Sequence, residues 1–196
     1  MKDEDTNLML RLKEGDQGAF RTLVERHKLT VLNLCLRFTG NRDDAEDLAQ
    51  DVFIRVYQAA PRYEIRAAFT TWLYRIAVNV CLNHQRRKKI LNFFSLNNRH
   101  SSSGAVENHL PELVLPQRPD SDLERKELQQ LVQNAIESLP ENQKSVLILH
   151  RYHDLSYQQI ATVLQTTVSA VESRLHRAKM NLKKQLRAIA HELDAT

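Results

Sequence analysis

The segment from residue 155 to residue 187 limits the possible folds of this chain more than any other part of it. Ser156 and Gln159 form a capping box, in which a hydroxyl and a side-chain carbonyl each accept from a backbone N–H at a helix start. Apolar residues then recur at helical spacing between residues 160 and 186, interrupted only by a polar turn at residues 165–167. The pattern predicts a short helix, a tight turn and a longer helix.

The polar face of the longer helix is rich in cations and carries one acid, Glu172, between residues 168 and 187. Such a face suits phosphates and base edges, as in a helix-turn-helix that presents its second helix to the DNA major groove. A solvated helical hairpin whose charges only keep it soluble fits the pattern too, because helix-turn-helix signals are degenerate. The other polar residues of this face are Ser173, Arg174, His176, Arg177, Lys179, Lys183, Lys184 and Arg187.

Composition and the placement of proline predict an all-α fold in two parts. The 196 residues include four Gly and five Pro, and no window alternates for long in the manner of a strand. Three of the five prolines fall between residues 90 and 121, together with a serine triplet and a glycine. We therefore expect two small helical domains, at residues 6–89 and 122–190, joined by a flexible linker at residues 90–121.

An acid-rich helix is predicted for residues 42–60, with five acids between residues 43 and 51. These carboxylates either stabilise the helix N-terminus through its dipole or form an acidic, partly apolar face for a basic protein partner. The residues alone leave both interpretations open.

A further helix begins near Phe69 and ends in a run of cations at residues 86–89. Cations at a helix C-terminus favour the helix dipole whatever the function. Together with polar side chains and aromatic rings, they also suit single-stranded nucleic acid, because bases stack on rings and the backbone follows charge. Trp72 fits a core position as well as a stacking platform. The polar face is predicted to comprise Thr71, Arg75, Asn79, Asn83 and Arg86.

Other sequence features argue against catalysis, metals and membranes. Cys35 and Cys81 lie in separate apolar stretches, which predicts buried free thiols in a reducing compartment. His150 and His153 lack a third zinc ligand nearby, and no convergent catalytic set or nucleotide-binding loop stands out. We expect no metal, no cofactor and no enzymatic activity. The N-terminal residues lack the apolar core of a signal peptide, so we expect a cytoplasmic protein without direct membrane insertion.

Three rival functions are compatible with parts of the pattern. A plain helix-turn-helix repressor or activator would bind duplex DNA without polymerase. An RNA-modifying enzyme with a basic C-terminal module would need catalytic side chains that are not apparent. A membrane-surface protein would need large apolar residues beside the terminal cations, and these are missing.

Taken together, the helical segments resemble the sigma-70 family of bacterial transcription initiation factors, and most closely its short extracytoplasmic-function (ECF) group. The matching sequence segments, in the family's order, are DAEDLAQDVFIRVY, FTTWLYRIAVNVCLN, IESLPENQKSVLILHRYHDLSYQQIA and VSAVESRLHRAKMNLKKQL. The resemblance implies that residues 6–89 form sigma region 2 and residues 122–190 form sigma region 4. It implies a factor that guides core RNA polymerase to promoter DNA, with an anti-sigma factor as a further partner.

The resemblance also implies roles for individual residues. The acid-rich helix would dock on the clamp helices of the largest catalytic subunit of polymerase through Asp47, Gln50, Asp51 and Arg55. The loop at residues 61–68 and the helix behind it would capture a flipped base of the minus-10 element through Tyr63, Arg66, Thr71, Trp72, Arg75, Asn79, Asn83 and Arg86. Region 4 would read the minus-35 element as duplex through Glu172, Ser173, Arg174, His176, Arg177 and Lys184.

Two residues depart from the family pattern. Ile65 stands where family members often have glycine, which implies that the loop selects a different base. Glu172 stands where relatives often place a cation, and a carboxylate accepts from cytosine but repels phosphate.

Overall fold

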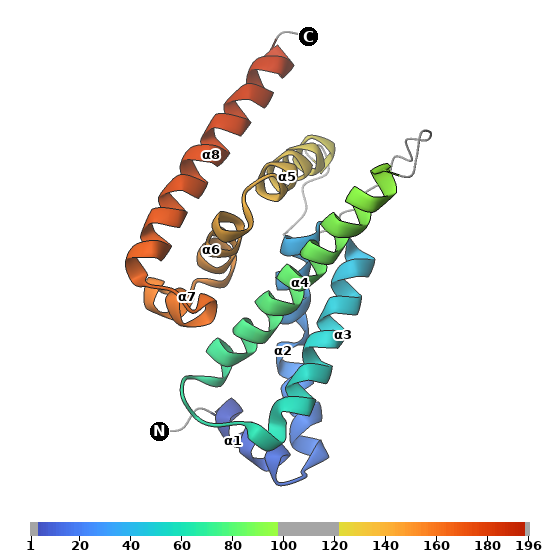
Figure 1. Cartoon of the computed structure of the whole chain (residues 1–196), viewed down its shortest axis with the longest axis vertical. Helices are drawn as coiled ribbons and strands as arrows, with labels where there is room; N and C mark the ends of the chain where they lie inside the picture. Colours follow the sequence, from blue (N-terminus) through green and yellow to red (C-terminus); the bar gives the residue numbers. More distant parts are fainter. Residues whose placement is uncertain (1–3, 98–121, 195–196) are drawn as a thin grey trace. The chain divides into compact units, whose positions relative to one another are not determined.

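The computed structural model describes residues 4–97 and 122–194 of the chain. All regular structure in these ranges is helical: α1 (Glu4–Lys13), α2 (Gln17–Thr39), α3 (Arg42–Ala59), the 3-10 helix η1 (Ala60–Arg62), α4 (Phe69–Asn97), α5 (Asp122–Glu137), α6 (Glu141–His153), α7 (Tyr157–Leu164) and α8 (Val168–Asp194) (Figure 1). One compact unit contains α1, α2, α4 and almost all of α3, and the other contains α5 to α8. The prediction of an all-α chain with two helical domains is confirmed.

The end of α4 differs from the prediction. This helix runs to Asn97 and not to residue 89, so residues 90–97 of the predicted linker are helical. The cations at residues 86–89 suit a helix C-terminus, but no Gly or Pro follows them before Asn97 to stop the helix. The remainder of the predicted linker, residues 98–121, lies outside the described residues.

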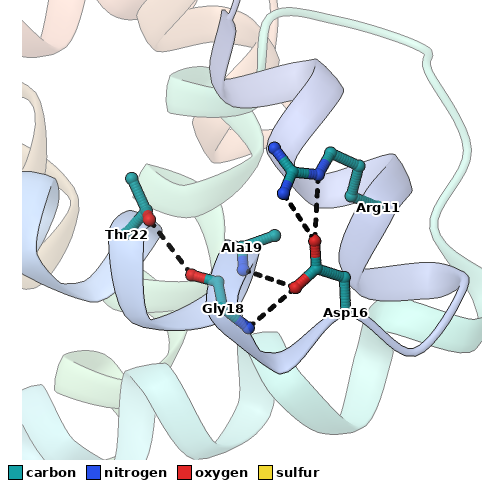
Figure 2. Close-up of polar contacts among 5 residues, drawn as sticks. All are labelled: Arg11, Asp16, Gly18, Ala19 and Thr22. Carbon is teal, nitrogen blue, oxygen red and sulfur yellow. Dashed lines mark hydrogen bonds and ion pairs between the residues drawn. The ribbon is translucent and has the colours of Figure 1, made fainter.

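A carboxylate organises the junction between α1 and α2 (Figure 2). Gly15 turns the chain with a φ of 99°. Asp16 then caps α2, because its Oδ1 accepts from the backbone N–H of Gly18 at 2.8 Å and of Ala19 at 3.1 Å. Its Oδ2 accepts from Arg11 Nη2 at 2.6 Å. The hydrogen bond from Arg11, followed by that from Ala19, holds the pKa of Asp16 below its ordinary value.

The core of the first unit lies between α2 and α4, which run side by side (Figure 1). Cys35 and Cys81 face each other there as buried free thiols, with 3.7 Å between their Sγ atoms, so the prediction of buried free thiols is confirmed. Gln85 Nε2 donates to the Phe38 carbonyl at 2.7 Å. These contacts fix the rotation of α4 about its own axis.

Polar contacts attach α1 to α2 and to the loop before α4. The buried carboxylate of Asp5 accepts from Arg26 Nη1 at 2.6 Å and lies 2.9 Å from His27 Nε2. The His27 ring packs on Phe69, with 5.4 Å between ring centroids. Lys13 Nζ donates to the Tyr63 carbonyl at 3.0 Å. The start of α4 and the loop that precedes it are thereby held in place.

The second unit contains the predicted helix-turn-helix. The capping box is formed, since Gln159 N donates to Ser156 Oγ at 3.3 Å and Ser156 N donates to Gln159 Oε1 at 2.8 Å. Gln165 ends α7 in the left-handed conformation, with a φ of 51°. Val171, Leu175 and Ala178 are buried on the inner side of α8, which packs on α5, α6 and α7.

Candidate protein and nucleic-acid interfaces

The acid-rich helix α3 presents one exposed face. Its buried side consists of small and medium apolar residues, Ala45, Leu48, Ala49, Val52 and Val56. The outer side carries Asp47, Gln50 and Arg55 exposed and Asp51 half-exposed, and together they span about 140° of the helix circumference. Arg55 Nε donates to Asp51 Oδ2 at 3.1 Å, one turn along the helix. The four residues predicted to contact polymerase therefore share one surface.

Two apolar side chains on the same face of α3 were not among the predicted contacts. Ile54 is 53% exposed and Tyr57 is 46% exposed. Tyr57 is partly anchored because its ring meets Phe20 edge-on, with 5.1 Å between centroids. Ile54 follows Gln50 and Asp51 at helical spacing, so the same periodicity argument identifies it. An acidic surface that also exposes apolar side chains is typical of a protein interface.

The polar face of α4 forms a second surface. Asn79, Asn83 and Arg86 are exposed, and Arg75 is half-buried in line with them. Trp72 lies on the same side of the helix, between Tyr63 at 5.0 Å and Phe69 at 5.8 Å, measured between ring centroids. The tryptophan is therefore held by neighbouring rings while part of it reaches the surface.

Two residues predicted to contact minus-10 DNA are buried. Tyr63 is 3% exposed and Thr71 is 6% exposed. For Thr71 the reason is helical geometry: each step of four residues turns about 40° further around the helix, so Thr71 lies about 120° from Asn83. Tyr63 is covered because its ring packs against Trp72. These two side chains support the surface and offer little area for direct contact with a base.

The loop between η1 and α4 carries further exposed residues. Arg66 forms an ion pair with Glu64, at 2.6 Å between Arg66 Nη2 and Glu64 Oε2. Ile65 lies between them and is 46% exposed. The residue that departs from the family pattern is thus accessible from solvent, next to a charge pair that is itself on the surface.

The exposed face of α8 forms the third surface. Glu172, Ser173, His176, Arg177 and Lys184 are exposed, whereas Arg174 is half-buried beside the apolar stripe. Arg177 is held by its own helix, since Nε donates to the Ser173 carbonyl at 3.2 Å and Nη2 donates to Ser173 Oγ at 3.0 Å. Five of the six predicted minus-35 residues therefore project to solvent from one helix.

No group of three or more His, Cys, Asp or Glu side chains in residues 4–97 and 122–194 is placed to hold a metal ion. Within the same ranges, no helix combines the length and apolar character that crossing a bilayer requires.

Comparison with protein families matches both units of the chain. The model for sigma-70 region 2 matches residues 23–90, and the model for sigma-70 region 4 matches residues 129–182. The first match contains the exposed faces of α3 and α4, and the second contains the helix-turn-helix.

Relatives match over nearly the whole chain. The RNA polymerase sigma-H factor of Pseudomonas aeruginosa is 33% identical, over 97% of this chain and 98% of its own length. The ECF RNA polymerase sigma factor SigW of Bacillus subtilis is 34% identical, over 90% and 94%. The ECF RNA polymerase sigma-E factor of Escherichia coli is 35% identical, over 89% and 90%. The chain therefore belongs to the sigma-70 family of RNA polymerase sigma factors, in its extracytoplasmic-function group.

Solved structures agree with the fold. CnrH in complex with the cytosolic domain of CnrY has a TM-score of 0.69 and 25% identity, over 95% of this chain and 99% of that one. The sigma factor RpoE of Bartonella quintana, solved with the anti-sigma factor NepR, has a TM-score of 0.64 and 21% identity, over 86% and 96%. The second likeness concerns the fold alone.

Proposed function

We propose that this chain is a bacterial RNA polymerase sigma factor of the ECF type, which directs core polymerase to specific promoters and promotes transcription initiation. The observation that carries the proposal is the match of region 2 and region 4, in family order, to the two helical units. The three exposed faces differ in charge and apolar content, as contacts with protein, melted DNA and duplex DNA require.

The face of α3 binds core polymerase. Asp47, Gln50, Asp51 and Arg55 supply its charged and polar contacts. Ile54 and Tyr57 add apolar area that is exposed in the free chain and is removed from water on binding. Opposite charges on the two partners set the orientation of docking and increase the rate of association.

The loop after η1 and the polar face of α4 bind the minus-10 element as single-stranded DNA. A base that leaves the duplex costs a few kcal/mol of stacking and pairing, and capture by protein side chains offsets that cost. Asn79 and Asn83 supply donors and acceptors for a base edge, and Arg66, Arg75 and Arg86 supply charge for the backbone. Tyr63 and Thr71 support the surface from below, with Trp72 at its edge.

Helix α8 binds the minus-35 element in the major groove. Ser173, His176 and Arg177 are in the first turns of the helix, where recognition helices contact base edges. Lys184 lies further along and contacts phosphate, and Arg174 contributes charge beside the apolar stripe. Recognition of duplex by one unit and of melted strand by the other couples promoter selection to promoter opening.

Membership of the ECF group supports a proposal for the regulation and the location of the chain. An anti-sigma factor binds the chain and keeps it from polymerase until a signal releases it. The chain works in the cytoplasm with polymerase and promoter DNA, and it acts by binding, without a catalytic step of its own and without a cofactor.

Run-off transcription tests the proposal. Core polymerase is incubated with a library of upstream sequences, with and without the chain, and transcripts are sequenced. We expect the chain to add transcripts from templates that share two short elements at a fixed spacing. The proposal fails if the chain does not co-elute with core polymerase, or if start sites are the same with and without it.

Gel-shift titration distinguishes a sigma factor from the rival helix-turn-helix repressor or activator. A sigma factor binds promoter duplex weakly by itself and tightly once polymerase is added. A repressor binds the same duplex with similar affinity in both conditions, which gel-shift titrations with and without core polymerase measure directly.

A further inference from the structure

Glu172 has an unusual place on the DNA-facing side of α8. It lies in the second turn of the helix, is exposed, and is the single acid between Val168 and Arg187. Within the described part of the chain, its carboxylate makes no hydrogen bond and no ion pair. Both carboxylate oxygens are therefore open to an external donor.

The fold of α8 does not depend on this carboxylate. Thr167 Oγ1 caps the helix by accepting from Ala170 N at 3.2 Å. Val171 and Leu175 supply buried contacts on the inner side. The helix dipole acts mainly on the first turn, so it stabilises an acid in the second turn only weakly. Glu172 can therefore be changed without loss of the helix.

Arg177, a cation of the same helix, is engaged elsewhere. The guanidinium of Arg177 donates to the carbonyl and hydroxyl of Ser173 and does not neutralise Glu172. A bare carboxylate in the major groove is repelled by phosphate whatever the sequence. That uniform cost is offset only where a base presents a hydrogen-bond donor to the carboxylate.

Of the four bases, one presents a suitable hydrogen-bond donor to a carboxylate in the major groove. In the major groove, guanine presents two acceptors, and thymine presents an acceptor and a methyl group. Adenine presents an amine donor, but its N7 acceptor lies beside that amine and repels a second carboxylate oxygen. Cytosine presents its N4 amine without a neighbouring acceptor.

We propose that Glu172 accepts a hydrogen bond from the N4 amine of a cytosine in the minus-35 duplex and thereby selects a C·G pair at one position. This inference rests on the proposed function, because it requires α8 to lie in the major groove of a promoter.

Selection from a library with a randomised minus-35 element tests the inference. Holoenzymes are formed with the wild-type chain, with Glu172→Gln and with a control, Glu14→Gln, which makes the same charge change at an exposed site in the other unit. We expect the wild type to prefer cytosine at one position by about tenfold. Glu172→Gln should shift that preference to adenine, since glutamine bonds to both N6 and N7. The control should keep the wild-type preference.

A base analogue gives a second measurement that does not rely on the glutamine variant. The selected cytosine is replaced by 2-pyrimidinone, which lacks the exocyclic amine. We expect wild-type holoenzyme to bind this promoter about tenfold more weakly, and Glu172→Ala to bind both promoters equally. Equal losses for the two proteins would overturn the inference.

The outcomes separate the inference from the function on which it rests. If the wild-type holoenzyme enriches no sequence, the proposed function fails and the inference fails with it. If the wild type selects promoters but Glu172→Gln selects the same bases at every position, only the inference fails.

Discussion

The exposed faces of α3 and α8 follow the same helical periodicity but suit different partners. Each helix buries a stripe of apolar residues and turns the other side to solvent. On α3 that side carries acids together with exposed Ile54 and Tyr57, whereas on α8 it is mostly cationic. Amphipathic spacing therefore establishes that a surface exists, and the sign of its charge is the basis on which we propose a protein partner for α3 and DNA for α8.

Replacing one acid of the α3 face by a cation should have the largest effect, which is on affinity for core polymerase. We expect Asp51→Arg to weaken binding to core polymerase by about a hundredfold, because it removes an acid and places a cation beside Arg55. Fluorescence titration of the labelled chain with core polymerase measures the affinity. Glu14→Arg, an exposed change of equal charge away from this face, is the control. Equal affinities of the two variants for core polymerase would contradict the assignment of the α3 face to polymerase binding, and with it the contrast between α3 and α8.

Removal of the Asn79 amide from the α4 face should reduce promoter opening. We expect Asn79→Ala to reduce the yield of open complex by about tenfold, since the flipped base loses contacts that offset its unstacking. Affinity for core polymerase should stay the same, because α3 is unchanged. Permanganate reactivity of unpaired thymines reports opening, and Asn33→Ala on the exposed side of α2 is the matched control.

Two cations on α8 should differ in what they recognise. We expect Arg177→Ala to lower discrimination by about 1 to 3 kcal/mol at one base pair, because a guanidinium reads base edges. Lys184→Ala should weaken binding to all promoters alike and reduce the salt dependence, because it removes a phosphate contact. Competition titrations at two salt concentrations distinguish the two results. If both variants affect every sequence equally, α8 has no division of roles.

The smallest effects concern the two helix caps, one from each unit. The folded-state pKa of Asp16 is depressed by Arg11 and by the α2 N-terminus, so its stabilisation is present above the unfolded pKa. It is lost as the pH falls through the folded pKa. We expect Asp16→Asn to lower Tm near neutral pH but not in strong acid.

The cap of α7 should respond differently to pH. Ser156→Ala should cost about 1 kcal/mol, and the loss should be the same across the acid range because a hydroxyl does not titrate there. Thermal unfolding followed by circular dichroism at several pH values compares the two variants. A pH-dependent loss for Ser156→Ala, or a pH-independent loss for Asp16→Asn, would contradict this difference.

The local sequence was sufficient to predict several of these helix faces and caps. Apolar spacing predicted which residues share the outer faces of α3 and α8, and Ser156 with Gln159 predicted the start of α7. These features depend on contacts within about one helical turn, which the order of residues determines directly. The sequence segments that match the family were then the basis for the role proposed for each face.

Tertiary structure decided which of the predicted residues reach the surface. Thr71 and Tyr63 belong to a polar, aromatic stretch by sequence, yet both are buried in the folded unit. Cys35 and Cys81 are distant in sequence, and only the packing of α2 on α4 brings their sulfur atoms to 3.7 Å. Periodicity determines the direction of a side chain about its own helix, but whether that direction meets solvent depends on neighbouring helices, whose positions arise from contacts between distant parts of the chain.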